Sequence, residues 1–324
     1  VDENANGDPT DDSDVTPIPV TLIEQIGAAK YVSGAIVDND DGTFTAPLTI
    51  RVENTGNQIL HDIQVVDDLA TEFGTLATGA VDAPGEYEIA AAPSISTNAA
   101  DALTANASYD GDATSSLLAI ASGGSLVVNE FIELTFSVRF FPDATSLPIT
   151  NQATASGDVT DDDDAVLNDG AEDLSDNNAV TVDENANGDP TDDSDVTPIP
   201  VTLIEQIGAA KYVSGAVVDN GDGTFTAPLT IRVENTGNQI LQDIQVVDDL
   251  ATEFGTLATG AVDAPGEYEI AAAPSISTNA ADALTANASY DGDATSSLLA
   301  IASGGSLIVN EFIELTFSVR FFPD

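Results

Sequence analysis

The sequence predicts an all-β protein of tandem antiparallel β-sandwich domains joined by Asp-rich linkers, and three observations predict it. Two long segments alternate strictly between apolar and polar residues, which is the period of a half-buried strand. No convincing helical period occurs, and turn residues separate about seven to nine strand candidates in each unit. Finally, residues 182–324 match residues 1–143 at all but four positions, so the unit is repeated.

The repeat sets the domain organisation. Its period of 181 residues is too long for a solenoid and fits one whole domain per unit. The four differences are Ile36 to Val217, Asp40 to Gly221, His61 to Gln242 and Val127 to Ile308. The second copy stops before its last expected strands, so we expect a longer parent. The expected parts are an acidic linker at 1–18, a first sandwich at 19–182 with an Asp-rich loop at 158–176, a second linker at 183–199, and a truncated second sandwich at 200–324.

The elements follow in order along one unit. Pro17 and Pro19 hold a stiff, extended lead-in to the domain. The clearest strands are at 44–52 and 131–141, where every second residue is apolar. Weaker strand candidates lie at 59–68, 86–90, 116–120, 149–156 and 179–182. The middle of the unit, rich in Ala, Ser, Gly and Asn, has the least defined layout.

Composition limits the partners. The chain carries 56 acidic and 6 basic residues, a formal net charge of −50, so neither nucleic acid nor an anionic membrane surface is expected to bind. Cations are the natural partners. At 42% hydrophobic residues the chain can still build cores. Cys is absent, so another cross-link, packing or bound ions must stabilise the fold. No apolar run is long enough to insert into a membrane.

The acidic linkers are candidate calcium sites, because oxygen donors alternate there around a Gly as in the first half of a calcium-binding loop. An EF-hand is not expected, since Ser13 takes the place of the bidentate Glu and no helices flank the loop. A solvated spacer is the alternative. A second candidate is the loop at 161–164 with Asp169, Asp173 and Asp176. The predicted linker ligands are Asp2, Asn4, Asn6, Asp8, Asp11, Asp12 and Asp14, and in the second copy Asp183, Asn185, Asn187, Asp189, Asp192, Asp193 and Asp195.

Lys30 and Asn151 form a candidate isopeptide cross-link. Strand parity places Lys30 with Ile26 and Ala28, and Asn151 with Ile149, so both side chains are expected to point inward. A desolvated lysine beside an amide and a carboxylic acid can form an amide bond. Glu53, Asp67 and Asp68 are the candidate acids, and a lysine that reaches the sheet edge is the alternative. Lys211 would lack its Asn, which falls beyond the last residue.

The strings LTIRVENTGNQILHDIQVVDDLATEFG, NQATASG, TDDDD and DENANGDPTDDSD resemble the conserved-repeat family of large bacterial and archaeal cell-surface proteins, catalogued as a domain of unknown function. The resemblance spans the whole unit. It implies an immunoglobulin-like sandwich, repeated in series in adhesins, stalks or fibres outside the cell, and no catalytic activity. The chain departs from the family in having only three basic residues per unit, Lys30, Arg51 and Arg139.

The first functional hypothesis is therefore a structural repeat of an extracellular fibre, adhesin stalk or surface filament that calcium extends and stiffens at the linkers. Its expected partners are further copies of itself, in the same chain or in neighbouring chains by strand exchange. The alternative is an adhesin module that binds a glycan or protein receptor by avidity. A third hypothesis takes the acidity as halophilic solvation alone. Enzyme activity is not expected, because no catalytic triad, phosphate loop or Cys/His cluster is found.

Overall fold

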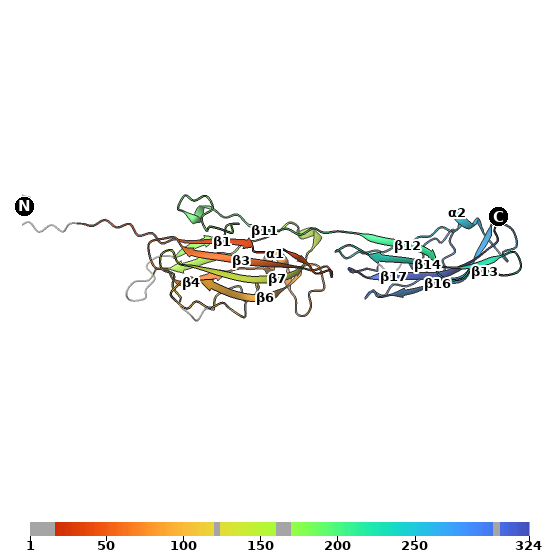
Figure 1. Ribbon diagram of the computed structural model, residues 1–324, viewed down its shortest axis with the longest axis horizontal. Helices are drawn as coiled ribbons and strands as arrows, with labels where there is room; N and C mark the ends of the chain where they lie inside the picture. Colours follow the sequence, from red (N-terminus) through yellow and green to blue (C-terminus); the bar gives the residue numbers. More distant parts are fainter. Residues whose placement is uncertain (1–16, 120–123, 160–169, 301–304, 324) are drawn as a thin grey trace, which may run out of the picture.

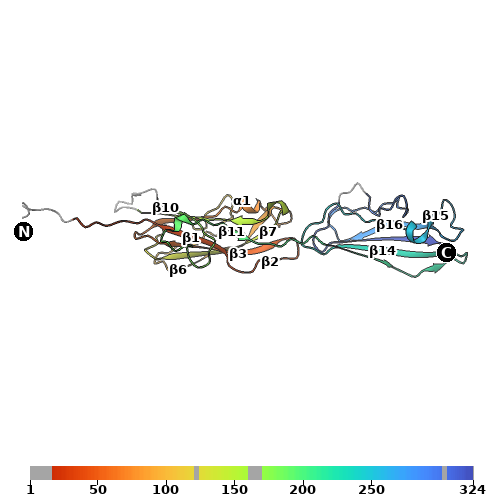
Figure 2. The same ribbon diagram turned by 90° about the horizontal axis from the view of Figure 1, so that it is seen from above.

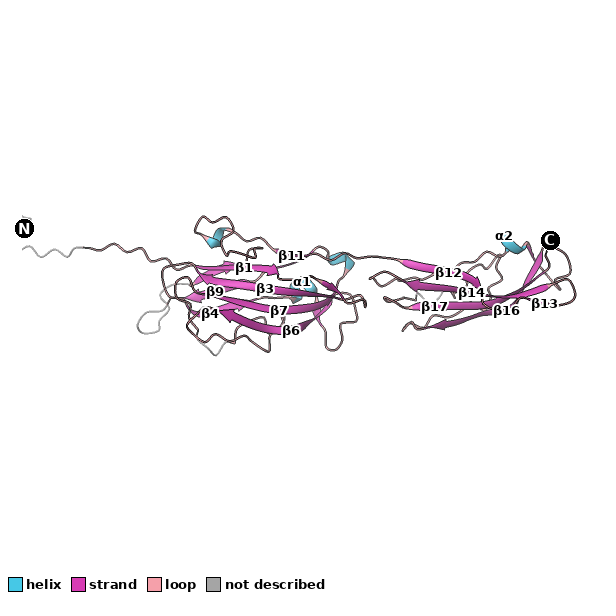
Figure 3. Ribbon diagram, in the orientation of Figure 1, coloured by secondary structure: helices cyan, strands magenta, loops and turns pink. Residues whose placement is uncertain are grey.

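The computed structural model describes residues 17–119, 124–159, 170–300 and 305–323, and within them the chain is all-β, as predicted. Strands dominate both copies of the repeat, and the few helices are one turn long (Figure 3). Each copy has its own hydrophobic core. The two copies lie end to end along the long axis of the molecule (Figure 1).

The first copy contains a six-stranded sheet in the order β1-β3-β7-β6-β5, with β2 paired to the other end of β3. All neighbours are antiparallel except β5 and β6. The bounds are β1 (Ile26–Val32), β2 (Val37–Asp38), β3 (Phe44–Asn54), β5 (Thr75–Leu76), β6 (Glu86–Thr97) and β7 (Phe131–Phe141). The two strongest predicted strands, β3 and β7, are therefore the centre of the sheet.

A second layer covers the inner face of this sheet. It consists of the three-stranded sheet β10-β9-β4 and the pair β8-β11. Leu48 of β3, Phe136 of β7 and Val65 of β4 belong to one buried cluster, so the core lies between the layers in a sandwich-like arrangement. The bounds are β4 (His61–Val66), β8 (Ile149–Asn151), β9 (Thr154–Asp158), β10 (Ala171–Leu174) and β11 (Thr197–Ile199), with α1 (Ala70–Phe73), η2 (Ala144–Ser146) and η3 (Pro190–Asp192) between them.

The alternating pattern explains the burial. Every second residue of β7 exposes at most 1% of its surface: Ile132, Leu134, Phe136, Val138 and Phe140. The residues between them are partly or fully exposed. Because successive side chains of a strand point to opposite faces, one face of this sheet is buried in the core and the other faces solvent. The register Leu48↔Phe136 places the buried faces of β3 and β7 on the same side of the sheet.

The second copy repeats the large sheet but not the second layer. Its order is β12-β14-β17-β16-β15, with β13 paired to β14. Among the described residues, no counterparts of β8 to β10 are found in the second copy. The bounds are β12 (Ile207–Val213), β13 (Val218–Asp219), β14 (Phe225–Asn235), α2 (Ala251–Phe254), β15 (Thr256–Leu257), β16 (Glu267–Thr278) and β17 (Phe312–Phe321).

Residues 197–206, which we call the strap, connect the copies and bind to both. On the first copy, β11 pairs with β8, Ile199 is 1% exposed, and Val201 packs against the core. On the second copy, the Ile204 amide donates to Asn238 Oδ1 at 2.7 Å. The junction, which Figure 2 shows from above, also contains a hydrogen bond of 2.8 Å from Asn238 Nδ2 to Asp38 Oδ2. The copies therefore meet through ordered contacts.

Several details differ from the sequence predictions: strand β10 lies within the loop expected at 158–176, and β11 lies within the linker expected at 183–199. Of the strand expected at 116–120, residues 116–119 are described and form only isolated bridges, such as Val66↔Ser116, and residues 179–182 form no strand. The short helix α1 was not expected; it is one turn that places Phe73 in the core. Among the described residues, no helix has the length and hydropathy needed to cross a membrane.

Candidate cross-linking site

Lys30 lies on the inner face of β1, in the middle of the first core. The strand IGAAKYV pairs with β3 so that Lys30 stands opposite Ile50. Because Ile26, Ala28 and Lys30 are two residues apart, they share one face of the strand. Lys30 is 0% exposed, so its amine does not reach solvent at the sheet edge. The inward orientation predicted from parity is thus found in the structure, and the lysine does not snorkel.

Two other segments bring a carboxylate and an amide to this amine. Asp67 follows directly after β4, and Asn151 is the last residue of β8. Both are buried, with exposed fractions of 0% and 2%. Asn151 stands opposite Thr197 of β11, whose hydroxyl donates to the Lys30 carbonyl at 2.8 Å. Residues far apart in the sequence therefore converge in the core.

The three side chains form a closed hydrogen-bonded triangle. Lys30 Nζ lies 2.5 Å from Asp67 Oδ2. The same amine donates to Asn151 Oδ1. Asn151 Nδ2 donates in turn to Asp67 Oδ1 at 3.0 Å. The carboxylate thus touches both the amine and the amide, and the amine touches the amide that it could attack.

The surroundings of the triangle are apolar. The Phe136 ring lies 5.9 Å from Lys30 Nζ, and the Tyr109 hydroxyl donates to the Asp67 carbonyl at 3.2 Å. Burial lowers the pKa of Lys30, against the opposing effect of Asp67. Desolvation therefore favours the neutral amine, which is the nucleophilic form. A buried amine, an amide and a shared carboxylate are the groups required for amide exchange.

The second copy contains only half of this site. Lys211 Nζ pairs with Asp248 Oδ1 at 2.6 Å, as Lys30 does with Asp67. The Lys211 side chain, however, is 36% exposed, because no strand equivalent to β8 covers it. The counterpart of Asn151 lies beyond the end of the chain, as the sequence indicated. The two copies are therefore a complete and an incomplete version of one site.

The sequence left three candidates for the acid, and the structure places one of them at the site. Glu53 forms a salt bridge with Arg51 at 2.9 Å on the outer face of the sheet. Asp68 accepts a hydrogen bond from the Thr71 amide at 3.3 Å. In the sequence, outward parity weakens Glu53, but Asp67 and Asp68 are not distinguished, because the direction of either side chain depends on where β4 ends.

The acidic loop, residues 183–195, is folded against the first copy. Asn185 Nδ2 donates to both Asp192 and Asp193, and Asn187 Nδ2 donates to Asp192. Pro190 is buried and packs over Gly27 of β1. The second set of predicted calcium ligands therefore lies within one compact loop, with Asp189 capping η3 and Asp195 exposed. The first set, Asp2 to Asp14, lies outside the described residues.

The other predicted acidic cluster is only partly described. Residues 161–164 and Asp169 fall outside the described parts of the chain, whereas Asp173 and Asp176 are 3% and 0% exposed. Burial raises the pKa of both carboxyl groups to about 7. Within the described ranges, no three Asp, Glu, His or Cys side chains converge as a preformed metal site.

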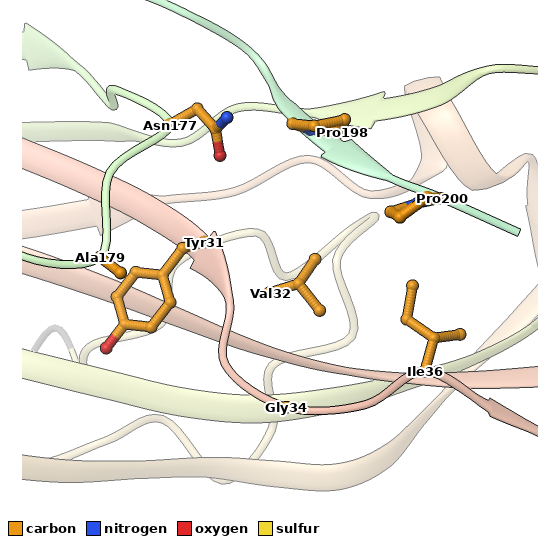
Figure 4. Close-up of a pocket in the computed structure, with 8 residues that line it drawn as sticks. All are labelled: Tyr31, Val32, Gly34, Ile36, Asn177, Ala179, Pro198 and Pro200. Atoms are coloured by element: carbon orange, nitrogen blue, oxygen red, sulfur yellow. The ribbon is translucent and has the colours of Figure 1, made fainter.

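An open pocket of about 590 Å³ lies where the strap crosses the end of β1 (Figure 4). Pro198 and Pro200 of the strap face Val32 and Ile36 across it, and Asn177 and Ala179 lie at its far end (Figure 4). No charged side chain lines it. Its lining is therefore mainly apolar, with Tyr31 and Asn177 as the polar side chains.

Comparison with known proteins adds little. No protein-family model matches the chain, and no curated protein sequence matches it. Among the solved structures that align with the chain is the CupB6 tip adhesin from Pseudomonas aeruginosa, which covers 93% of this chain and 88% of its own at 10% sequence identity, with a TM-score of 0.19. An alignment with so low a TM-score carries no argument about fold or function.

Proposed function

We propose that the chain is a structural repeat of an extracellular fibre or adhesin stalk, in which each immunoglobulin-like unit locks itself with an isopeptide bond. The observation that carries the proposal is the buried contact of Lys30 with Asn151 and Asp67. The resemblance of the sequence to the repeats of cell-surface proteins and the absence of Cys support it. A covalent bond in the core would take the place of the disulfide that the chain lacks.

The chemistry balances without any external reagent. The neutral Lys30 amine attacks Cγ of Asn151, so that the Nζ–Cγ bond forms. Asp67 accepts a proton from the attacking nitrogen at Oδ2 and then passes it to Asn151 Nδ2, which donates a hydrogen bond to Asp67 Oδ1. The Cγ–Nδ2 bond then breaks and ammonia leaves. No oxidant or reductant is needed, and the product is an amide between β1 and β8.

The position of the bond suits a chain under tension. The linked residues are 121 positions apart, so the loop between them leaves the force path once the bond has formed. Tension then passes from β1 directly to Asn151 and onward to the strap. The end-to-end arrangement of the copies (Figure 1) supports such a role. Calcium at the acidic loops would add stiffness between units by binding the ordered form of the loop and not the loose form.

Intact mass of the purified chain under denaturing conditions tests the cross-link. We expect a mass lower than the sequence mass by one ammonia molecule, because only the first copy contains the complete site. Lys30→Met and Asp67→Asn should each restore the full sequence mass. The matched control is Lys211→Met, which alters the incomplete copy and should still lose one ammonia relative to its own sequence. An unmodified wild-type mass would end the proposal.

The cellular role needs a separate measurement. Antibodies against the chain should label filaments or the outer surface of intact cells that produce it. Labelling confined to the interior of permeabilised cells would contradict an extracellular stalk, even if the cross-link were found.

A further inference from the structure

The junction between the two copies is formed by a hairpin of the first copy and two asparagine side chains of the second. The hairpin joins β2 to β3 at the end of the first copy that adjoins the second copy, which we call the far end of a unit. Asp38 Oδ2 accepts from Asn238 Nδ2 at 2.8 Å, and the Asp40 carbonyl accepts from Asn310 Nδ2 at 3.0 Å. The opposite end of a unit, its near end, thus supplies two donors, and the far end supplies two acceptors.

The near end of the second copy is covered at this junction. Asn238 and Gln239 are each 8% exposed. The same residues of the first copy, Asn57 and Gln58, are exposed and half-buried. Because residues 55–60 and 236–241 are identical in sequence, the contact with the first copy accounts for the difference. The near end is therefore an interaction surface that is occupied in one copy and open in the other.

The far end of the second copy repeats the acceptor half of the junction. In the β13–β14 hairpin, at the end of the molecule away from the first copy (Figure 1), Asp219 takes the place of Asp38 and is exposed. Asp219 Oδ1 accepts from the Gly221 amide at 2.8 Å, as Asp38 Oδ1 accepts from the Asp40 amide at 3.0 Å. Both Asp40 and Gly221 have a positive φ, of 59° and 76°, so the exchange keeps the turn and its carbonyl acceptor. Asp219 Oδ2, whose counterpart binds Asn238, has no partner among the described residues.

The near end of the first copy repeats the donor half. Asn57 and Asn129 take the places of Asn238 and Asn310, and both are exposed. Asn57 is already oriented, because its Nδ2 donates to the Thr21 carbonyl at 2.9 Å, just as Asn238 Nδ2 donates to the equivalent carbonyl at 3.1 Å. A side-chain amide has two N–H donors, and in the second copy the other one crosses the junction. The free near end thus has the geometry of the occupied one.

We propose that the far end of the second copy binds the near end of the first copy of another molecule of this chain. Asp219 would accept from Asn57, and the Gly221 carbonyl would accept from Asn129. The contact repeats, between chains, the donors and acceptors that already meet inside the chain. Two different surfaces meet in it, and such a heterologous contact builds a filament when it does not close into a ring. The end-to-end arrangement of the copies (Figure 1) favours a filament.

Salt should strengthen this association. Each chain carries a formal net charge of −50, so two chains repel each other at low ionic strength. The proposed contact joins a carboxylate and a carbonyl to neutral amides, and it contains no salt bridge for salt to weaken. Raising NaCl to about 1 M shortens the Debye length to about 3 Å and removes most of the repulsion. Association that increases with NaCl is therefore expected.

The inference deepens the proposed function, on which it rests for the role of the contact in a fibre. The contact itself uses none of the cross-linking residues, so Lys30→Met should associate as the wild type does. The mass loss of ammonia is measured under denaturing conditions, where chains separate. Failure of the cross-link and failure of the contact between chains are therefore distinguishable.

Sedimentation velocity of the full chain in about 1 M NaCl tests the contact. The wild type should form oligomers that grow with concentration. Asp219→Asn keeps an oxygen for the turn but places a donor opposite the Asn57 donor, so it should lower the association constant about tenfold or more. Asp38→Asn, the same change at the internal junction, is the matched control and should associate as the wild type does. A wild type that stays monomeric, or equal effects of the two variants, would overturn the inference. Association that survives Asp219→Asn would assign it to another surface, such as the uncovered face of the second copy, and would also overturn it.

A mixing experiment tests the polarity of the contact. Asn129 has a φ of 66°, which glycine adopts readily, so Asn129→Gly removes the near-end donor without straining the backbone. This variant should also associate more weakly than the wild type. At concentrations where Asp219→Asn and Asn129→Gly are each monomeric, their mixture contains one intact far end and one intact near end. It should form a dimer and nothing larger. A mixture that stays monomeric, or that forms longer oligomers, would contradict head-to-tail association.

Discussion

Ile18 and Ile199 are the same residue in two copies of one sequence, but Ile18 is 83% exposed and Ile199 is 1% exposed. Ile199 belongs to β11, which pairs with β8 and enters the core of the first copy. Within the described residues, which begin at 17, no unit lies before Ile18 against which it could pack. The segment that opens each repeat therefore completes the unit before it, and the structural unit is displaced along the chain relative to the sequence repeat.

This displacement predicts different costs for one substitution at two positions. Ile199→Ala should destabilise the first copy by about 2 kcal/mol or more, because it leaves a cavity in a packed core. Ile18→Ala should change stability by less than about 0.5 kcal/mol, as is usual for exposed sites. Urea denaturation of both variants would measure the difference. Equal effects would show that the strap does not stabilise the first copy.

The cross-link should raise thermal stability strongly. Closing a loop of 121 residues corresponds to about 5 kcal/mol in the chain-entropy model. For a domain of this size that amounts to about 10–20 °C in the unfolding temperature. Lys30→Met should lower the melting temperature of the first copy by a shift of this order. Lys211→Met should leave that transition in place, and calorimetry that finds equal shifts for the two variants would count against the bond.

The buried amine predicts a pH dependence when the bond is prevented. In Asn151→Ala the amine stays free, and burial lowers its folded-state pKa below the ordinary value of 10.5. Between these two pKa values the unfolded chain binds more protons than the folded one, so the free energy of unfolding rises with pH.

The measurement is denaturant unfolding of Asn151→Ala as the pH is raised toward 10.5. The Asp67 carboxylate and the Tyr109 hydroxyl are the other titratable groups near the amine. Tyr109 keeps its proton in the folded protein, because burial and Asp67 raise its pKa. Its loss of that proton in the unfolded chain lowers the free energy of unfolding near pH 10, and this opposite slope is common to both variants. The double variant Lys30→Met/Asn151→Ala should lose the positive slope. A positive slope retained in the double variant would assign the effect to other groups.

The acidic loop packs so closely on β1 that position 27 has no room for a side chain. A Cβ at Gly27 would lie 2.6 Å from the Val182 side chain and 3.0 Å from Pro190, whereas at Gly208 the nearest atom is 3.4 Å away. Gly27→Val should therefore cost about 1–3 kcal/mol by overpacking. It should also speed cleavage by a glutamyl endopeptidase at Glu184, which is exposed in the acidic loop. Gly208→Val, at the equivalent position of the second copy, should be tolerated. Similar losses for both would mean that strand geometry, and not loop docking, requires the glycine.

The sequence predicted the central strands well, because their signal is local. Alternation along β3 and β7 identifies both the strand and its buried face without knowledge of the partner. The same parity placed Lys30 and Asn151 inside, and the structure brings them into contact. The choice of Asp67 as the acid depends on the meeting of β1, β8 and the end of β4, which no local pattern encodes.

Residues 61–66 and their counterparts 242–247 show the limit of what the local sequence predicts about secondary structure. They differ only at His61 and Gln242, but the first segment is strand β4 and the second is not a strand. The reason is that β4 obtains its backbone hydrogen bonds from β9, which has no counterpart after β17. Local patterning thus determined the all-β class, the large sheets and the inward direction of Lys30. Only the tertiary structure decided which segment covers that sheet, because a strand and a buried lysine both need partners from distant parts of the chain.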